Sequence, residues 1–173
     1  MRKIFTILIL AVAIYSLMAT PVFGHPDSIG ASAVLKNSSI NQDNRGEILR
    51  NFLGKYNSPL APYAQEFVAA ADSYGVDWKL VPAITGVEST FGKQIPFGSY
   101  NAYGWNNGDF RFSSWEDSIW YVTSQLRTRY LDRGAVSVSQ IGRIYAPPSP
   151  FWPGKVSSFM AKIEMTSSFT LDL

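Results

Sequence analysis

The chain has 173 residues, of which 46% are hydrophobic and 16% charged, a composition typical of a folded globular domain. Its 15 basic and 13 acidic residues give a net charge of +2, and removal of Arg2 and Lys3 with a leader would leave 13 of each. This balance argues against a general nucleic-acid binder and against a polybasic membrane-surface protein. The absence of Cys and the single His exclude disulfides, thiolate chemistry and a multi-histidine metal site, so we expect no metal and no cofactor.

The N-terminus has the pattern of an export signal. Arg2 and Lys3 precede an uncharged apolar run over 4–19, and Pro21 and Gly24 follow near a plausible cleavage point. The run is shorter than the roughly 20 residues that a membrane-spanning helix needs. We therefore predict a signal peptide over 1–24, with an uncleaved anchor as the alternative. The mature protein would be exported to the periplasm, the cell wall or the medium, with no membrane attachment.

Residues 25–45 are polar and lack hydrophobic periodicity, which predicts a flexible linker before a single domain over 46–173. We expect this domain to be a monomer. Its first half has helical periodicity, with a short helix near 48–53 and a second over 62–74 that Gly75 would end. A third helix would start at an Asp77 N-cap and end near 91–92. In the alternative, Pro82, just past the first turn, delays the start of this helix or bends it there.

The middle of the domain has a different pattern. Two short segments, 103–105 and 110–112, alternate apolar with small or polar residues, and Asn107-Gly108 lies between them. Asn-Gly is the strongest short-range signal for a type I′ hairpin turn, because both central residues must adopt positive φ. We therefore predict one β-hairpin here.

The second half again has helical periodicity. Ser114 to Asp117 resembles a capping box and opens a helix that continues to about Tyr130, while Ser137 to Gln140 opens a shorter one. A Pro-rich loop over 146–153 leads to a last helix around 156–163. The predicted fold class is mostly α (α+β), a helical domain with one hairpin. We assign no role to the charged end of the long helix, which carries Arg127, Arg129, Asp132 and Arg133.

Glu88 is the first candidate for chemistry. It lies beside the apolar stripe of the third helix and near its C-terminus, where the helix dipole and partial burial both disfavour a negative charge. A carboxyl kept protonated near neutral pH is what a general acid for glycosidic cleavage requires. The alternative is a structural glutamate that is exposed or hydrogen-bonded to N–H groups.

The segment 97–112 could bind sugars. It interleaves six aromatic residues with three asparagines and Asp109, and aromatic faces and amide groups together suit sugar rings and their hydroxyl or acetamido groups. In the alternative interpretation these aromatics cover the core. The stiff loop 145–153 is either a further binding element or a plain connector.

At this point four segments in the same order resemble a known family. Residues 83–92, AITGVESTFG, resemble the A-I-x-x-x-E-S-x-F-G signature of the lysozyme-like superfamily, which includes soluble lytic transglycosylases and bacterial endo-β-N-acetylglucosaminidases. The others are similar to elements that follow it in such domains: NAYGW at 101–105, FRF at 110–112 with 115–119, and Tyr145-Ala146 with Trp152 and Lys155-Val156.

The resemblance implies a lysozyme-like helical domain with a hairpin beside a sugar cleft, acting on peptidoglycan glycan strands. It implies that Glu88 is the catalytic acid and that Asp109 is a possible second acidic residue. It places Ser89, Asn101, Tyr103, Trp105 and Tyr145 at substrate-binding positions. Hydrolysis and lytic transglycosylation both remain open, as does the bond that is cut. The competing function is a non-catalytic peptidoglycan-binding module.

Overall fold

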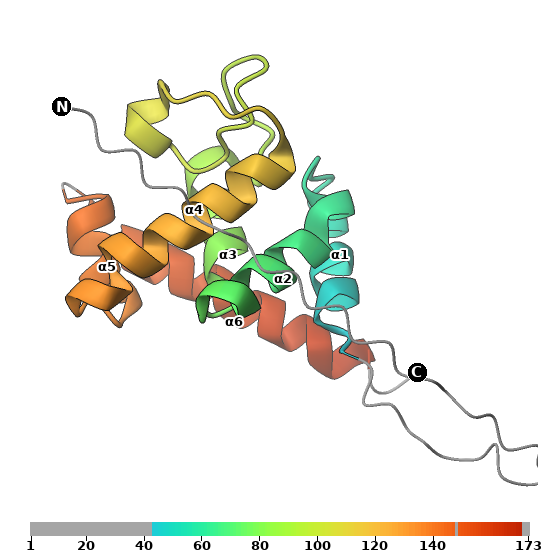
Figure 1. Ribbon diagram of the computed structural model, residues 1–173. Coiled ribbons are helices and arrows are strands. Elements are labelled where there is room, and N and C mark those ends of the chain that lie inside the picture. Colours follow the sequence, from blue (N-terminus) through green and yellow to red (C-terminus); the bar gives the residue numbers. More distant parts are fainter. Residues whose placement is uncertain (1–42, 148, 171–173) are drawn as a thin grey trace, which may run out of the picture. The chain divides into compact units, whose positions relative to one another are not determined.

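Helices dominate the structure, a computed structural model that describes residues 43–147 and 149–170, without the side chains of 167–170 (Figure 1). The predicted leader and nearly all of the predicted linker lie outside the described residues. Six α-helices follow one another: α1 (Arg45–Lys55), α2 (Ala64–Tyr74), α3 (Leu80–Ser89), α4 (Trp115–Arg129), α5 (Val138–Tyr145) and α6 (Trp152–Thr170). Short 3₁₀ turns, η1 (Ala61–Tyr63), η2 (Trp105–Gly108) and η3 (Leu131–Arg133), lie between them.

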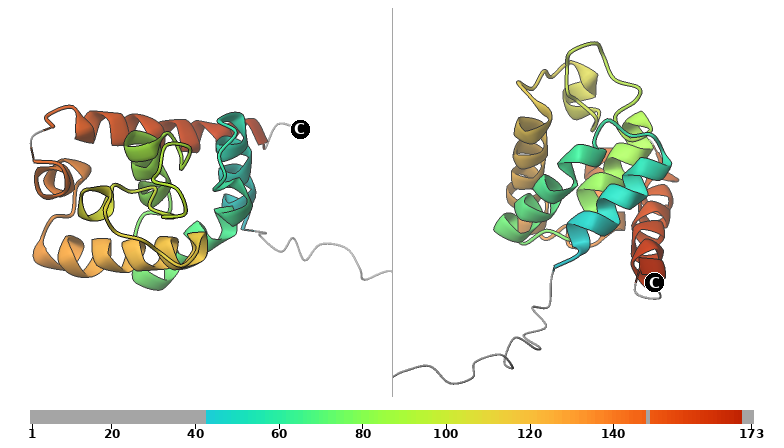
Figure 2. Two further views of the ribbon diagram at one scale, coloured as in Figure 1. Left: turned by 90° about the horizontal axis from the view of Figure 1, so that it is seen from above. Right: turned by 90° about the vertical axis from the view of Figure 1, so that its right-hand side faces the viewer.

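The central element is α3. Six consecutive residues from Leu80 to Thr85 are buried, which is the pattern of a helix surrounded by protein on all sides. Figure 2 shows α4 and α6 running on opposite sides of α3, with α1 and α5 toward the two ends. The long segment 90–114 leaves the C-terminal end of α3 and returns to α4. The end of α3 is therefore the place where side chains from several elements can meet.

Local signals explain several helix ends. Gly75 ends α2 in the left-handed conformation at φ 60°. The capping box at Ser137 is complete, because Ser137 Oγ accepts from Gln140 N and the Gln140 side chain accepts from Ser137 N. At α4 only half of the predicted box forms. Ser114 Oγ accepts from Asp117 N, but the Asp117 carboxylate accepts from Ser113 instead.

The third helix begins after the predicted Asp77 N-cap, in agreement with the alternative of a late start near Pro82. Asp77 Oδ1 accepts from Lys79 N, and Asp77 O accepts from Leu80 N, so Asp77 organises a turn before α3 and does not cap it. Pro82 then lies in the first turn of the helix, where its missing N–H has no helical acceptor. The helix ends at Ser89 because Thr90 adopts left-handed backbone angles of φ 53° and ψ 50°.

The predicted β-hairpin is wrong, although its turn is present. Asn107 and Gly108 have positive φ, and Asp109 N donates to Asn106 O at 3.0 Å, as a type I′ turn requires. Four of the five residues from 104 to 108 have positive φ, which is incompatible with an extended strand before the turn. No β-strand occurs in residues 43–147 or 149–170, so the described domain is all-helical.

Candidate active site

Glu88 occupies the penultimate position of α3, at the C-terminal end of this central helix. Its side chain is half-buried. The exposed carbonyl groups of a helix C-terminus carry partial negative charge and disfavour a carboxylate there. Glu88 therefore lies near the C-terminus of its helix, as the sequence indicated, at a position where a negative charge on its carboxyl is disfavoured.

Two groups contact the carboxyl of Glu88 from other parts of the chain. The indole Nε1–H of Trp152, the first residue of α6, donates to Glu88 Oε1 at 2.6 Å. On the other side, Gly104 approaches so closely that an added Cβ would lie 2.9 Å from Glu88 Oε2. Gly104 also has φ 63°, so both its backbone and its lack of a side chain allow this contact.

Burial raises the pKa of the Glu88 carboxyl above its ordinary value of 4.5, and the Trp152 hydrogen bond opposes this effect more weakly. The direction follows from the chemistry, since desolvation penalises the charged form whereas an N–H donor favours it. The result is a carboxyl that holds its proton to higher pH than an exposed glutamate does. Such a group can act as a general acid.

Tyr145, at the end of α5, lies beside this carboxyl. Its hydroxyl donates to Tyr103 O at 2.6 Å, and its ring stacks on Trp152 with centroids 5.2 Å apart and planes inclined by 26°. Burial, and after it the negative charge of Glu88, hold the pKa of the Tyr145 phenol well above its ordinary value. Glu88, Gly104, Tyr145 and Trp152 thus form one cluster drawn from α3, the long loop, α5 and α6.

A polar hollow of about 330 Å³ opens next to the cluster. The ring of Trp105 lies edge-on to Tyr145, with centroids 6.2 Å apart. Aromatic rings, asparagine amides and a guanidinium are the groups that bind sugar rings and their hydroxyls. The lining residues are Gly104, Trp105, Asn106, Asn107, Arg129, Tyr130 and Tyr145.

The predicted substrate-binding residues divide into two groups. Trp105 and Tyr145 line the hollow. Ser89, Asn101 and Tyr103 are 2%, 2% and 0% exposed, so their side chains have almost no surface to offer a ligand. These three residues support the site from within.

The contacts of Ser89 and Asn101 explain how they do so. Ser89 Oγ lies 2.8 Å from Ala102 O and accepts from Gly92 N at 2.9 Å, which ties the end of α3 to the long loop. Asn101 Nδ2 donates to Trp105 O at 2.9 Å and to Phe110 O at 3.0 Å, and Asn101 Oδ1 accepts from Trp105 N at 2.9 Å. The side-chain hydrogen bonds of the buried Asn101 thus hold Trp105 and Phe110, where the predicted hairpin would have used backbone hydrogen bonds between two strands.

Asp109, the possible second acid, is exposed in the turn. Its side chain makes no hydrogen bond to any residue in the described ranges, and it does not line the hollow. Among the described residues, no other carboxylate forms a hydrogen bond with the Glu88 carboxyl. A partner carboxylate for Glu88 is therefore not assigned.

Gly104 and Arg129 are site residues that sequence reasoning missed. The Asn-Gly turn signal drew attention to 107–108 and not to Gly104, whose contact with Glu88 crosses 16 positions of the chain. Arg129 was interpreted as part of a solvated helix end, and it is indeed exposed, as are Asp132 and Arg133, but it also lines the hollow. Its neighbour Arg127 instead forms an ion pair with Asp132 at 2.8 Å. No local pattern distinguishes the two arginines.

Replacement of Trp152 by Phe should raise the pKa of Glu88 further, because the substitution removes the N–H that favours the carboxylate. If Glu88 is the acid, the alkaline limb of the pH–activity profile moves to higher pH. Trp120→Phe is the matched control, since Trp120 Nε1 donates to Glu66 Oε2 at 2.8 Å in the same way but outside the site. An unchanged limb in Trp152→Phe would contradict the assignment.

Residues 43–147 and 149–166 contain no cluster of three acidic or His side chains that could hold a metal ion. No helix in the described part of the chain combines the length and the apolar character needed to cross a membrane. Comparison with protein-family models and with curated proteins finds no match to this chain.

Proposed function

We propose that the protein is an exported enzyme that cleaves β-1,4 glycosidic bonds of peptidoglycan, with a lysozyme-like arrangement and Glu88 as general acid. The observation that carries the proposal is the environment of Glu88. Its carboxyl is half-buried at a helix C-terminus, its pKa is raised by desolvation, and its neighbours Gly104 and Tyr145 line a hollow that also contains aromatic rings and amides. The four sequence segments that resemble peptidoglycan-cleaving domains support the same conclusion.

Each group has a role in this proposal. Glu88 protonates the glycosidic oxygen as the bond breaks, a type of assistance worth about 10²–10⁴-fold in general. Trp105 and Tyr145 offer ring surfaces to the sugars, and the exposed Asn106 and Asn107 offer amides. Trp152 orients the carboxyl through its hydrogen bond to Oε1.

The test is to incubate the purified protein with cell-wall glycan and to identify the products by mass spectrometry. The mechanism we propose is lytic transglycosylation, in which Glu88 also acts as base and a hydroxyl of the substrate attacks. Anhydro-muropeptides would support that mechanism, and reducing ends would indicate hydrolysis. A protein that releases neither product would contradict the proposed function.

Asp109→Asn distinguishes the mechanisms further. We expect this variant to keep activity within about twofold of the parent, because an exposed surface substitution away from the carboxyl changes little. Hydrolysis through a second carboxylate would require two carboxyls at roughly 5–9.5 Å. If Asp109→Asn folds and is inactive, Asp109 is that second acid and the single-carboxyl mechanism is wrong.

The second candidate function is a peptidoglycan-binding module without catalysis. The specific observation in its favour is that Glu88 is not among the described residues that line the polar hollow. Zymography in wall-containing gels separates the two functions, because a binder retains wall material without clearing it.

A further inference from the structure

A second concave surface includes Val87, the residue that precedes Glu88 in α3. We call it the α3–α6 groove; it has a volume of about 670 Å³ and includes Val87, Phe151, Lys155, Ser158, Phe159 and Lys162. Val87 precedes Glu88 in α3, and Phe151 precedes Trp152, whose indole is bonded to Glu88. The groove therefore includes the residues that directly precede Glu88 in α3 and Trp152 at the start of α6.

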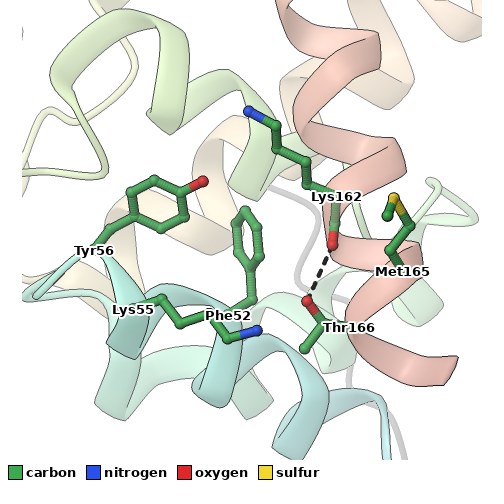
Figure 3. A pocket seen from close by; sticks show the side chains of 6 residues that line it. All are labelled: Phe52, Lys55, Tyr56, Lys162, Met165 and Thr166. Carbon is green, nitrogen blue, oxygen red and sulfur yellow. Dashed lines mark hydrogen bonds between the residues drawn. The ribbon is translucent and has the colours of Figure 1, made fainter. Parts of the chain in front are cut away.

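The groove has an adjoining pocket at its far end. Figure 3 shows Phe52 and Lys55 of α1, with Tyr56 directly after this helix, facing Lys162, Met165 and Thr166 of α6 across the α1–α6 pocket, which measures about 240 Å³. Lys162 lines both hollows, and the ring of Phe159 in the groove lies 6.3 Å from that of Tyr56 in the pocket. Together they form one track along α6 that leads away from Glu88.

The charges along this track have one sign. Lys155, Lys162 and Lys55 line it in that order, and none of the described residues that line it is acidic. None of these lysines forms an ion pair with a residue of the described ranges. The apolar part is accessible as well, since Phe151 is 74% and Met165 60% exposed. Such a surface is complementary to a chain that combines carboxylates with small apolar groups.

The spacing of the lysines limits the shape of the ligand. Lys155 and Lys162 are seven positions apart and share one face of α6, about 10 Å apart along the axis at 1.5 Å per residue. An extended peptide rises about 3.3 Å per residue, so carboxylates about three residues apart would match both lysines.

We infer that the α3–α6 groove binds the acidic peptide attached to the glycan, with Lys155 and Lys162 receiving its carboxylates while the glycan lies at Glu88. This inference rests on the proposed function and specifies its substrate: the enzyme prefers peptide-bearing to peptide-free glycan strands. The lysines are specificity-determining residues, because they contact the substrate away from the bond that is cut.

The experiment compares kcat/KM on peptide-bearing strands and on strands from which an amidase has removed the peptides. The preference is the kcat/KM on peptide-bearing strands divided by that on peptide-free strands. In the full chain, the double variant Lys155→Gln/Lys162→Gln should lower this ratio about tenfold, equivalent to about 1.4 kcal/mol. The preference of the parent should also weaken as salt rises, because the charges are exposed. Lys93→Gln, which removes an exposed lysine outside the track, is the matched control and should leave the ratio unchanged.

The outcomes separate the two proposals. An unchanged ratio in the double variant, with both substrates cleaved, overturns the peptide groove and leaves the proposed function in place. No cleavage of either substrate by the parent overturns both. Loss of binding to vesicles of anionic phospholipid in the double variant, with an unchanged ratio, would identify the track as a membrane-facing surface and overturn the peptide assignment.

Discussion

Glu88→Gln should abolish wall cleavage, by at least about 10²–10⁴-fold, while the protein still folds and still binds wall material. Glutamine keeps the shape of the side chain and can still accept the Trp152 hydrogen bond at Oε1. It cannot deliver a proton to the glycosidic oxygen. The measurement combines wall clearing, wall pull-down and melting temperature on one preparation.

The parent and Glu88→Gln should also differ in how their free energy of unfolding depends on pH. Because the folded-state pKa of Glu88 is raised, the folded protein binds more protons than the unfolded chain at pH values between the two pKa values. The free energy of unfolding of the parent therefore falls as pH rises from about 4.5 through the folded-state pKa. Glu88→Gln should lack this decline and be the more stable of the two above that range.

The chain offers a closely matched control. Glu66 is also half-buried and also accepts a hydrogen bond from an indole, that of Trp120, at 2.8 Å. Glu66→Gln makes the same chemical change outside the site and should retain parental clearing. If Glu88→Gln clears wall at near-parental rates, Glu88 is not the acid and the binding-module function is favoured.

Asn101→Asp should destabilise the protein by about 3 kcal/mol at neutral pH, a large effect for an isosteric change. The Asn101 amide donates to two backbone carbonyls, those of Trp105 and Phe110, and it is 2% exposed. The substitution places a carboxylate oxygen against both carbonyl oxygens and buries a charge. Chemical denaturation measures the loss.

The pH dependence of the destabilisation in Asn101→Asp shows whether the buried charge causes it. The new carboxyl should have a raised pKa in the folded state, so the destabilisation is smallest below about pH 4 and grows as pH rises. Asn101→Ala loses the same hydrogen bonds without a charge and should cost about 2 kcal/mol at every pH. Asn51→Asp, at an exposed position of α1, should change stability by less than about 0.5 kcal/mol.

Asn101→Asp should also lower the cleavage rate of the molecules that remain folded, beyond the loss that unfolding alone would cause. The amide holds the segment that brings Gly104 to Glu88 and Trp105 to the hollow. A displacement of about 1 Å at such a segment can cost about 10²-fold in rate. A variant that melts and cleaves like the parent would show that the amide does not hold this segment.

The elements predicted correctly depend on interactions between near neighbours. The stop at Gly75, the capping box of Ser137 with Gln140, and the buried face of α4 with Ile119, Val122 and Leu126 all arise within a few residues. The type I′ turn at Asn107-Gly108 belongs to the same class, because positive φ is a local preference. Such preferences are visible in any single sequence.

The hairpin prediction failed because a local turn does not oblige its flanking segments to pair. Asn101 lies only four residues before Trp105, yet the sequence contains no sign that its amide bonds to Trp105 and Phe110 in place of a strand ladder. These hydrogen bonds form because Asn101 is buried, and a buried amide must satisfy its hydrogen bonds with the backbone groups that lie near it.

The sequence by itself determined the helices, the stop at Gly75, the capping box at Ser137, the position of Glu88 at the edge of an apolar helix face and the presence of aromatic and amide groups after it. Only the tertiary structure decided which groups meet that carboxyl. Trp152 is 64 residues from Glu88, and its indole reaches Oε1 because α6 packs along α3. Gly104 reaches the other oxygen because the long loop folds back over the end of α3. Desolvation of the acid results from this packing of distant segments, and packing between distant segments leaves no periodic pattern in the sequence.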